Sequence, residues 1–220
     1  MTDESTRPAG RRERNKEEKR SRIFDAAARL FDRDGFAAVT TQQIADEADV
    51  AAGTVFRYAA TKAELLVMVY NDKSAQSIQS GIDADDPDGP AADRALRLVT
   101  PLVRAGRNSD ENTLVYQREI LFGDPGERYR AEGLELFVAL RERIAATLRD
   151  SWLRANPGAS PAPDSAAAAR AIFAAMHLAI ADAAITATST DDLLTDLAAD
   201  FEVIARGYLT TPTTSEKEQQ

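Results

Sequence analysis

Apolar residues recur at helical spacing along almost the whole of this 220-residue chain. In the first such segment, Ile23, Ala27 and Leu30 fall on one face of a helix that is expected to begin near Ser21. Gly35 follows, and because glycine commonly terminates helices, we expect this helix to end there. Ala, Leu, Arg and Glu dominate the chain, and alternating β-branched runs are absent. The sequence therefore predicts an all-α fold.

Two capping-box patterns divide the next stretch into short helices. The first pairs Thr40 with Gln43, and the second pairs Thr61 with Glu64. At this spacing a hydroxyl and a polar side chain satisfy free amides at the start of a helix. Asp49 interrupts the pattern between the two boxes, and Asp tolerates the left-handed geometry that a tight turn needs. Two short helices separated by a turn are therefore expected before a longer helix.

The remaining helices are expected to be longer and to be separated by turn-forming residues. They are predicted near residues 90–107, 110–122, 127–155, 165–187 and 191–208. An acidic loop, IDADDPDGPAAD, precedes them. A calcium loop would need oxygen ligands where Ala84 and Ala95 stand, so we reject a metal site there.

Several kinds of chemistry are disfavoured by composition. The chain has no cysteine and one histidine, His177, and its 11 glycines form no phosphate-binding loop. We therefore expect no catalytic site, metal or cofactor, although a carboxylate-based hydrolase stays open. The longest charge-free runs, 35–45 and 171–181, are too short to span a membrane, and the amino terminus lacks a secretory signal. A cytoplasmic protein without a membrane partner is expected.

The net charge of −9 is unevenly distributed along the chain. Residues 1–66 contain 12 Lys and Arg and 12 Asp and Glu, so the whole acidic excess lies in residues 67–220. Residues 1–22 alone are net +3 and almost lack apolar side chains. This segment is either a solvated tail or an arm that follows DNA phosphates.

The residues from Ile23 to Leu66 carry a more specific signal. They combine an A-x-x-L-F face that ends at Gly35-Phe36, a T-T-x-x-I-A segment from Thr40, and Gly53-Thr54 followed by two aromatics. This combination resembles the amino-terminal DNA-binding domain of the TetR family of bacterial transcriptional regulators. The resemblance implies a helix-turn-helix whose recognition helix enters the major groove. Asp49 replaces the usual turn glycine, and alanines stand at positions that are often polar.

Carried over by position, the resemblance implies a set of DNA-binding residues: Thr40, Thr41, Gln42, Thr54, Phe56, Arg57, Tyr58 and Lys62. Gln42 is able to bind adenine through its amide, and Lys62 is expected to meet a phosphate at a helix start. Structural roles compete with these assignments, since Thr40 caps a helix and Tyr58 also suits packing between helices.

The resemblance further implies a larger helical domain that binds an effector and forms a homodimer. The expected organisation is a basic flexible arm at 1–18, a helix-turn-helix domain at 19–66, an effector and dimerisation domain at 67–210, and a disordered tail at 211–220. Candidate pocket residues are Tyr116, Phe122, Phe137, Trp152, Phe173 and His177. Candidate dimer-interface residues are Ile172, Met176, Ile180, Leu197, Phe201 and Ile204. Ordinary core packing is the alternative for both sets.

The sequence therefore predicts a homodimeric transcriptional repressor that a small-molecule effector releases from a palindromic double-stranded DNA operator. An adaptor bundle with a degenerate helix-turn-helix is the second hypothesis, because Ala51, Ala52 and Ala59 offer no hydrogen bonds to DNA. Neither the effector nor the operator sequence is specified by these residues.

Overall fold

The computed structural model describes residues 10–159 and 161–211. Within them the chain forms helices and no strand, which confirms the predicted all-α fold. The helices are α1 (Arg11–Ala38), α2 (Thr41–Glu47), α3 (Ala52–Val55), α4 (Lys62–Asp83), α5 (Ala91–Gly106), α6 (Asp110–Phe122), α7 (Arg128–Ala155), α8 (Ala166–Thr186) and α9 (Thr190–Leu209). The first nine residues of the predicted arm, and all of the predicted tail after Thr211, lie outside the described residues.

Helix α1 begins earlier than the sequence indicated. It starts at Arg11, so the described part of the predicted flexible arm is helical. Arg, Glu and Lys are good helix formers, and Arg20 pairs with Glu17 at 3.1 Å across one turn. Near its other end the helix is interrupted at Gly35, which has φ 79° and ψ 164°. Such backbone angles are open almost only to glycine, so the predicted break is confirmed.

Capping contacts fix the starts of α2 and α4 in the expected places. Thr40 and Gln43 form a complete capping box at the start of α2. Thr61 accepts a hydrogen bond from the Glu64 amide at 2.9 Å, but the Glu64 carboxylate accepts one from Ala60 instead of completing the box. Asp49 adopts φ 52°, as predicted for the turn between α2 and α3.

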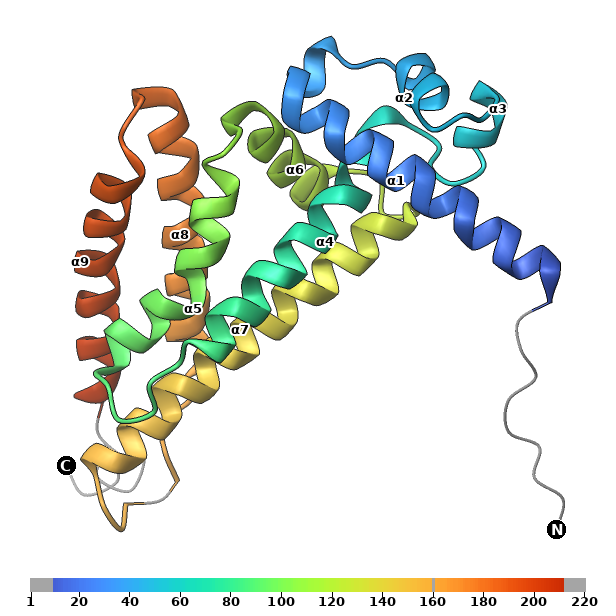
Figure 1. Cartoon of the computed structure of the whole chain (residues 1–220). Helices are drawn as coiled ribbons and strands as arrows, with labels where there is room; N and C mark the ends of the chain where they lie inside the picture. Colours follow the sequence, from blue (N-terminus) through green and yellow to red (C-terminus); the bar gives the residue numbers. More distant parts are fainter. Residues whose placement is uncertain (1–9, 160, 212–220) are drawn as a thin grey trace, which may run out of the picture.

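The helices form a small head and a larger body that share one long helix (Figure 1). The head contains α1, α2 and α3, and α4 continues from it into the body through the predicted boundary at residues 66 and 67. In the body, α7 packs along α4, while α8 and α9 pack together on the side away from α2 and α3. The head is therefore attached to the body mainly through α4.

Two hydrophobic clusters correspond to these two parts. The first combines the interior of the head with Tyr116, Ile120, Tyr129 and Phe137 from the body. The second fills the space between α5, α7, α8 and α9. Phe173 packs against both clusters. Side chains of α6 and α7 thus belong to the same apolar interior as the head, so a movement of either helix is felt there.

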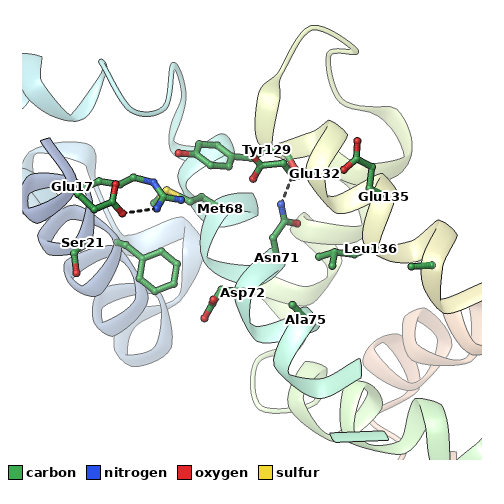
Figure 2. Close-up of a pocket in the computed structure, with 13 residues that line it drawn as sticks. Glu17, Ser21, Met68, Asn71, Asp72, Ala75, Tyr129, Glu132, Glu135 and Leu136 are labelled. Carbon is green, nitrogen blue, oxygen red and sulfur yellow. Dashed lines mark hydrogen bonds and ion pairs between the residues drawn. The ribbon is translucent and has the colours of Figure 1, made fainter. Parts of the chain in front are cut away.

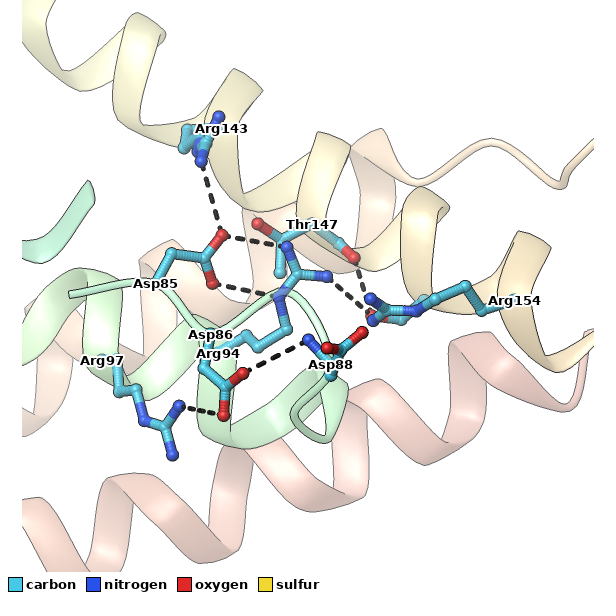
Figure 3. A network of polar contacts seen from close by, with 9 residues as sticks. Asp85, Asp86, Asp88, Arg94, Arg97, Arg143, Thr147 and Arg154 are labelled. Carbon is cyan, nitrogen blue, oxygen red and sulfur yellow. Dashed lines mark hydrogen bonds and ion pairs between the residues drawn. The ribbon is translucent and has the colours of Figure 1, made fainter. Parts of the chain in front are cut away.

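A buried ion pair anchors the acidic loop between α4 and α5 (Figure 3). Arg94 donates two hydrogen bonds to Asp85, at 3.0 and 2.9 Å, and both side chains are about 5% exposed. Arg143 approaches the same carboxylate at 3.4 Å, and Arg97 pairs with Asp86 at 3.0 Å. Two carboxylates of the loop that the sequence singled out are therefore neutralised by arginines.

Helix α8 is apolar on two sides. Among the described residues it is the one helix whose length and composition would allow it to cross a membrane, with a mean hydropathy of 1.5 over an 18-residue window. Ile172, Met176 and Ile180 face the core, whereas Leu178 and Ile185 are 63% and 79% exposed. Core helices also reach such hydropathy, so composition alone does not say what covers the exposed side.

Candidate functional site

Four of the predicted DNA-binding residues lie in α3 and the turn that follows it. Thr54 lies in α3, and Phe56, Arg57 and Tyr58 follow in the turn after it. Phe56 is 51% exposed although it is a large apolar side chain, and Arg57 is also exposed. The Tyr58 hydroxyl donates a hydrogen bond to the Lys16 carbonyl at 3.1 Å, which joins this turn to α1. The exposed turn after α3 thus carries the Phe56 ring next to the Arg57 guanidinium in sequence.

Residues at the start of α2 are ordered by local hydrogen bonds. Thr40 caps the helix, and Thr41 occupies its first position. The Gln42 amide donates to the Asp46 carboxylate at 2.7 Å, one turn further along. Since both side chains are exposed, this bond is exchangeable for a contact with a base edge.

Lys62 is held by contacts within the protein. Its ammonium donates to the carbonyls of Phe36 and Val39, at 2.7 and 2.8 Å, and lies 4.2 Å from the Phe36 ring centre. These bonds tie the start of α4 to the chain between α1 and α2. Lys62 therefore has a structural role within the head, and its phosphate contact stays a prediction.

Residues of both α1 and α7 line two grooves. One, here called the basic groove, has a volume of about 540 Å³ and is lined by Lys16, Lys19, Arg20, Arg57 and Arg128, together with polar and aromatic side chains. Among the residues that the structure describes, no acidic side chain lines it. It includes Thr54 and Tyr58, so it is continuous with the face that was predicted to bind DNA.

The other groove, here called the acidic groove, has a volume of about 590 Å³ (Figure 2). Its carboxylates are Glu17, Asp72, Glu132 and Glu135. Arg20 borders both grooves. A hydrogen bond with Tyr129 raises the pKa of this guanidinium above its ordinary value; burial opposes the rise, and a hydrogen bond with Glu17 adds to it. Arg20 and Tyr129 thus lie at the border of two surfaces of opposite charge.

A small cavity of about 40 Å³ lies inside the body between α4, α5, α6, α7 and α8. Of the six predicted pocket residues, Tyr116, Phe137 and His177 line it. Phe173 stands behind the wall, with its ring centre 4.4 Å from that of His177. Phe122 is 81% exposed at the end of α6, and Trp152 is buried in the second core cluster, so neither reaches the cavity.

The sequence analysis did not predict the other ten lining residues of this cavity as pocket residues. They are Tyr70, Lys73, Ser74, Leu102, Ala105, Gly106, Thr113, Gln117, Met176 and Ile180. Tyr70, Lys73 and Ser74 have the i, i+3, i+4 spacing of one helix face, which was an available signal. Only the fold shows that this face turns toward α6 and α8.

Polar groups in the cavity are uncharged apart from Lys73. Burial lowers the pKa of His177 to about 4 and raises the pKa values of Tyr70 and Tyr116 to about 12. The Gln117 amide lies 3.1 Å from Nδ1 of His177, and Nε2 of that ring is buried without a hydrogen-bond partner among the described residues. The cavity therefore offers a neutral imidazole nitrogen to a bound molecule.

Helix α6 links this cavity to the carboxyl end of α1. The Glu111 carboxylate accepts a hydrogen bond from the Ala37 amide at 2.8 Å, and the Asn112 amide donates to the Phe31 carbonyl at 2.8 Å. Lys73 of the cavity also pairs with Asp32 of α1. A displacement of the cavity wall thus reaches the head through hydrogen bonds as well as through packing.

The predicted dimer-interface residues mostly belong to the core of one chain. Five of them are less than 5% exposed, namely Ile172, Met176, Ile180, Leu197 and Phe201, and Ile204 is half-buried. A side chain without accessible surface cannot bury more in a dimer, so these five are corrected to core residues. The exposed faces of the same helices carry Leu178, Ile185 and Val203, with exposures of 63%, 79% and 72%.

Comparison with known proteins identifies the head and the overall fold. Residues 23–69 match the family model described as bacterial regulatory proteins, tetR family. The transcriptional repressor KstR of Rhodococcus jostii (strain RHA1) is 28% identical over 155 residues, which cover 70% of this chain and 68% of that protein. KstR of Mycolicibacterium smegmatis is 32% identical over 108 residues, covering 49% of this chain and 52% of the repressor.

Solved structures share the arrangement of head and body. The repressor FadR of Thermus thermophilus in complex with lauroyl-CoA has a TM-score of 0.64 at 23% identity, covering 89% of this chain and 97% of that one. FadR of Bacillus subtilis in complex with stearoyl-CoA has a TM-score of 0.62 at 18% identity, covering 86% and 98%. At these identities the likeness establishes the fold.

Proposed function

From a chain that belongs to the TetR family of bacterial regulatory proteins, we infer a homodimeric repressor that a small-molecule effector releases from a palindromic operator in the cytoplasm. The observation that carries this proposal is the pairing of two features. The exposed Arg57 and the half-buried Thr54 and Tyr58 border a groove that no described carboxylate lines, while an interior cavity is linked to α1 through α6. One feature suits DNA, and the other suits control of DNA binding.

The exposed apolar faces of α8 and α9 support a homodimer. Leu178, Ile185 and Val203 lie on neighbouring helices, and Ala171 and Ala174, which precede Leu178 along α8, are also exposed. Small side chains allow helices to approach closely, so a second copy is able to cover both faces in a four-helix arrangement. We assign the exposed side of α8 to this interface and not to a membrane.

Effector binding requires the interior cavity to expand. Pockets for drug-sized ligands occupy roughly 300 to 1,000 Å³, far more than the about 40 Å³ present here. A ligand that enters must therefore displace α6 or α8, and α6 carries the Glu111 and Asn112 contacts to α1. A ligand that prefers the displaced arrangement weakens DNA binding. By linkage, bound DNA weakens the binding of that ligand by the same factor.

The effector is proposed to be amphipathic. The cavity has an aromatic and aliphatic lining with Gln117 and His177 as polar anchors. A wider groove of about 550 Å³ shares Tyr70, Lys73 and Ala105 with it and opens toward solvent. An apolar chain would lie inside and a polar head outside, with the Lys73 ammonium between them. Acyl-CoA molecules have this construction, and they are the ligands named for the two FadR structures.

Selection from a random pool of DNA duplexes tests the core of the proposal. We expect an enriched palindrome whose half-sites are spaced by about one helical turn or a multiple of it. No enrichment at low salt would contradict a sequence-specific regulator. Lauroyl-CoA should then release the selected duplex, whereas CoA alone should not, and release by neither would refute the acyl-CoA assignment while leaving the regulator in place.

The dimer is tested by placing a charge on its expected face. Leu178→Glu should convert the protein to monomers in light scattering, because a buried unpaired carboxylate is costly at an interface. Phe122→Glu is the matched control, since this side chain is exposed and apolar but lies at the end of α6. A dimer that survives Leu178→Glu would contradict the assigned surface.

A further inference from the structure

One cation of the basic groove comes from the body and not from the head. Arg128 is the first residue of α7, and it lines the same groove as Lys16, Lys19 and Arg57. Its side chain is 71% exposed and is held by Glu132 at 2.7 Å, one turn along the helix. The body thus places a positive charge beside the face that the head offers to DNA.

We propose that Arg128 binds a backbone phosphate of the operator, so that DNA is held by the head and the body together. The proposal rests on the proposed DNA-binding function and adds a contact from the effector domain. Five of the groove's lining residues are Lys or Arg and none is acidic, which is the lining that a chain of phosphates requires. Hydroxyls of Thr54 and Tyr58 border the same groove. Such groups commonly bind phosphate oxygens.

The start of α7 reinforces this site. The cap residue Glu127 makes no side-chain hydrogen bond to the helix amides. The amino end of a 28-residue helix adds partial positive charge where Arg128 stands, and the neighbouring Glu127 carboxylate opposes part of it. The exposed pair of Arg128 with Glu132 is weak, because solvent screens it. A phosphate, which accepts two parallel hydrogen bonds from a guanidinium, is able to compete for Arg128.

The body fixes the position of Arg128 firmly. The Asn71 side-chain amide of α4 donates a hydrogen bond to the Tyr129 backbone carbonyl at 2.7 Å. The Tyr116 hydroxyl of α6 donates one to the side-chain Oδ1 of Asn71 at 2.9 Å. The first turn of α7 is therefore connected to a cavity residue. Any rotation of the body relative to the head changes the distance between Arg128 and Arg57. Operator DNA bound to both residues holds the two parts in one arrangement, and an effector that rotates the body removes one contact.

The salt dependence of DNA affinity tests this assignment. The full-length protein is titrated against the duplex enriched in the selection experiment, at several salt concentrations. The logarithm of affinity falls with that of salt by about 0.9 for each phosphate contact. Arg128→Ala should therefore reduce the slope by about 0.9 per protomer and weaken binding at 0.1 M salt by about eightfold per protomer. Arg128→Lys should keep most of the slope.

Two further variants separate a DNA contact from a structural effect. Arg97→Ala removes an exposed arginine with a comparable ion pair, to Asp86 at 3.0 Å, on the loop side of the body, and should leave affinity and slope unchanged. Glu132→Gln frees Arg128 from its carboxylate and should strengthen DNA binding. Equal slopes for the wild type and Arg128→Ala would overturn the proposal, as would equal losses in Arg97→Ala and Arg128→Ala.

Inorganic phosphate tests whether the basic groove binds a free anion instead of a phosphate of DNA. If phosphate stabilises the wild type but not Arg128→Ala against thermal unfolding, while both bind DNA equally, the groove is a site for a free anion and the DNA assignment is overturned. If the wild type itself binds no selected duplex, the proposed function fails first, and this outcome is visible before any variant is made.

Discussion

The two grooves beside the contact of Arg20 with Tyr129 are similar in size and opposite in charge. The basic groove contains five cations and no carboxylate among its lining residues, whereas the acidic groove contains four carboxylates and shares the single cation Arg20. The two flanks therefore differ in local charge within a chain of net charge −9. We expect DNA to be attracted to the basic flank and repelled from the acidic one, because local charge and not net charge decides its approach.

Buried charge in the body should affect folding instead of DNA binding, and this effect is the largest we expect. Arg94→Ala leaves the Asp85 carboxylate buried without its two-bond partner, which should lower the free energy of unfolding by about 3 to 5 kcal/mol. Urea denaturation at pH 7 measures it. The exposed variant Arg97→Ala should change it by less than about 1 kcal/mol. Equal losses in the two variants would contradict the distinction.

Charge reversal in the basic groove should have the next largest effect. Arg57→Glu removes a phosphate contact and adds repulsion in each protomer, so affinity for the selected duplex should fall by about a hundredfold at 0.1 M salt. Fluorescence anisotropy measures this change.

The acidic groove supplies the counterpart of that experiment. Glu135→Lys changes the charge by the same amount in the opposite direction, but on the far flank, and should alter affinity by less than about threefold. If Glu135→Lys strengthens binding as much as Arg57→Glu weakens it, only net charge matters and the comparison of the two flanks is wrong.

The change of stability in mild acid should report on His177 in the interior cavity and not on the two grooves. Burial lowers the pKa of His177 to about 4 from an ordinary value near 6.5, so the unfolded chain binds more protons than the folded one between these values. Stability is complete above about pH 6.5 and falls as the pH drops toward 4. We expect a loss of about 2 kcal/mol between pH 7 and pH 5.

His177→Gln is the control for this titration, because His177 is the only histidine of the chain. In that variant most of the stability difference between pH 7 and pH 5 should disappear. If the full difference persists, carboxylates in the grooves or elsewhere are responsible instead.

A modest loss of stability should distinguish Lys62 from the cations of the basic groove. Lys62→Met removes two charge-assisted hydrogen bonds inside the head and should lower the free energy of unfolding by about 1 to 2 kcal/mol. The slope of affinity against salt should be unchanged, because the ammonium binds carbonyls and not phosphate. A reduction of that slope by about 0.9 per protomer would restore the phosphate contact predicted from sequence.

Much of the fold was predictable because helix boundaries are local features. Thr40, Asp49 and Gly35 all adopt the predicted caps, turn or break. The start of α1 was misjudged because its first turns bury no apolar face, and hydrophobic spacing was the signal used. Their helix-forming Arg, Lys and Glu residues carried the information instead.

The site was less predictable because it depends on which helix faces meet. Tyr116 and Phe122 are both aromatic residues of α6, yet one is buried at the cavity and the other is 81% exposed. Ile172 and Leu178 on α8 likewise divide between core and surface. Spacing along one helix does not say which of two apolar faces turns inward. Lys62 shows the same limit for charge, since its carbonyl partners come from another segment.

Photo-cross-linking shows directly whether DNA lies along the basic flank only. A benzophenone side chain is placed at Lys19 of the basic groove in one variant and at Glu135 of the acidic groove in another, and each is irradiated with the selected duplex. We predict a protein and DNA adduct from position 19 and none from position 135. An adduct from position 135, or no adduct from either position while the duplex is bound, would show that DNA does not lie along the basic flank alone.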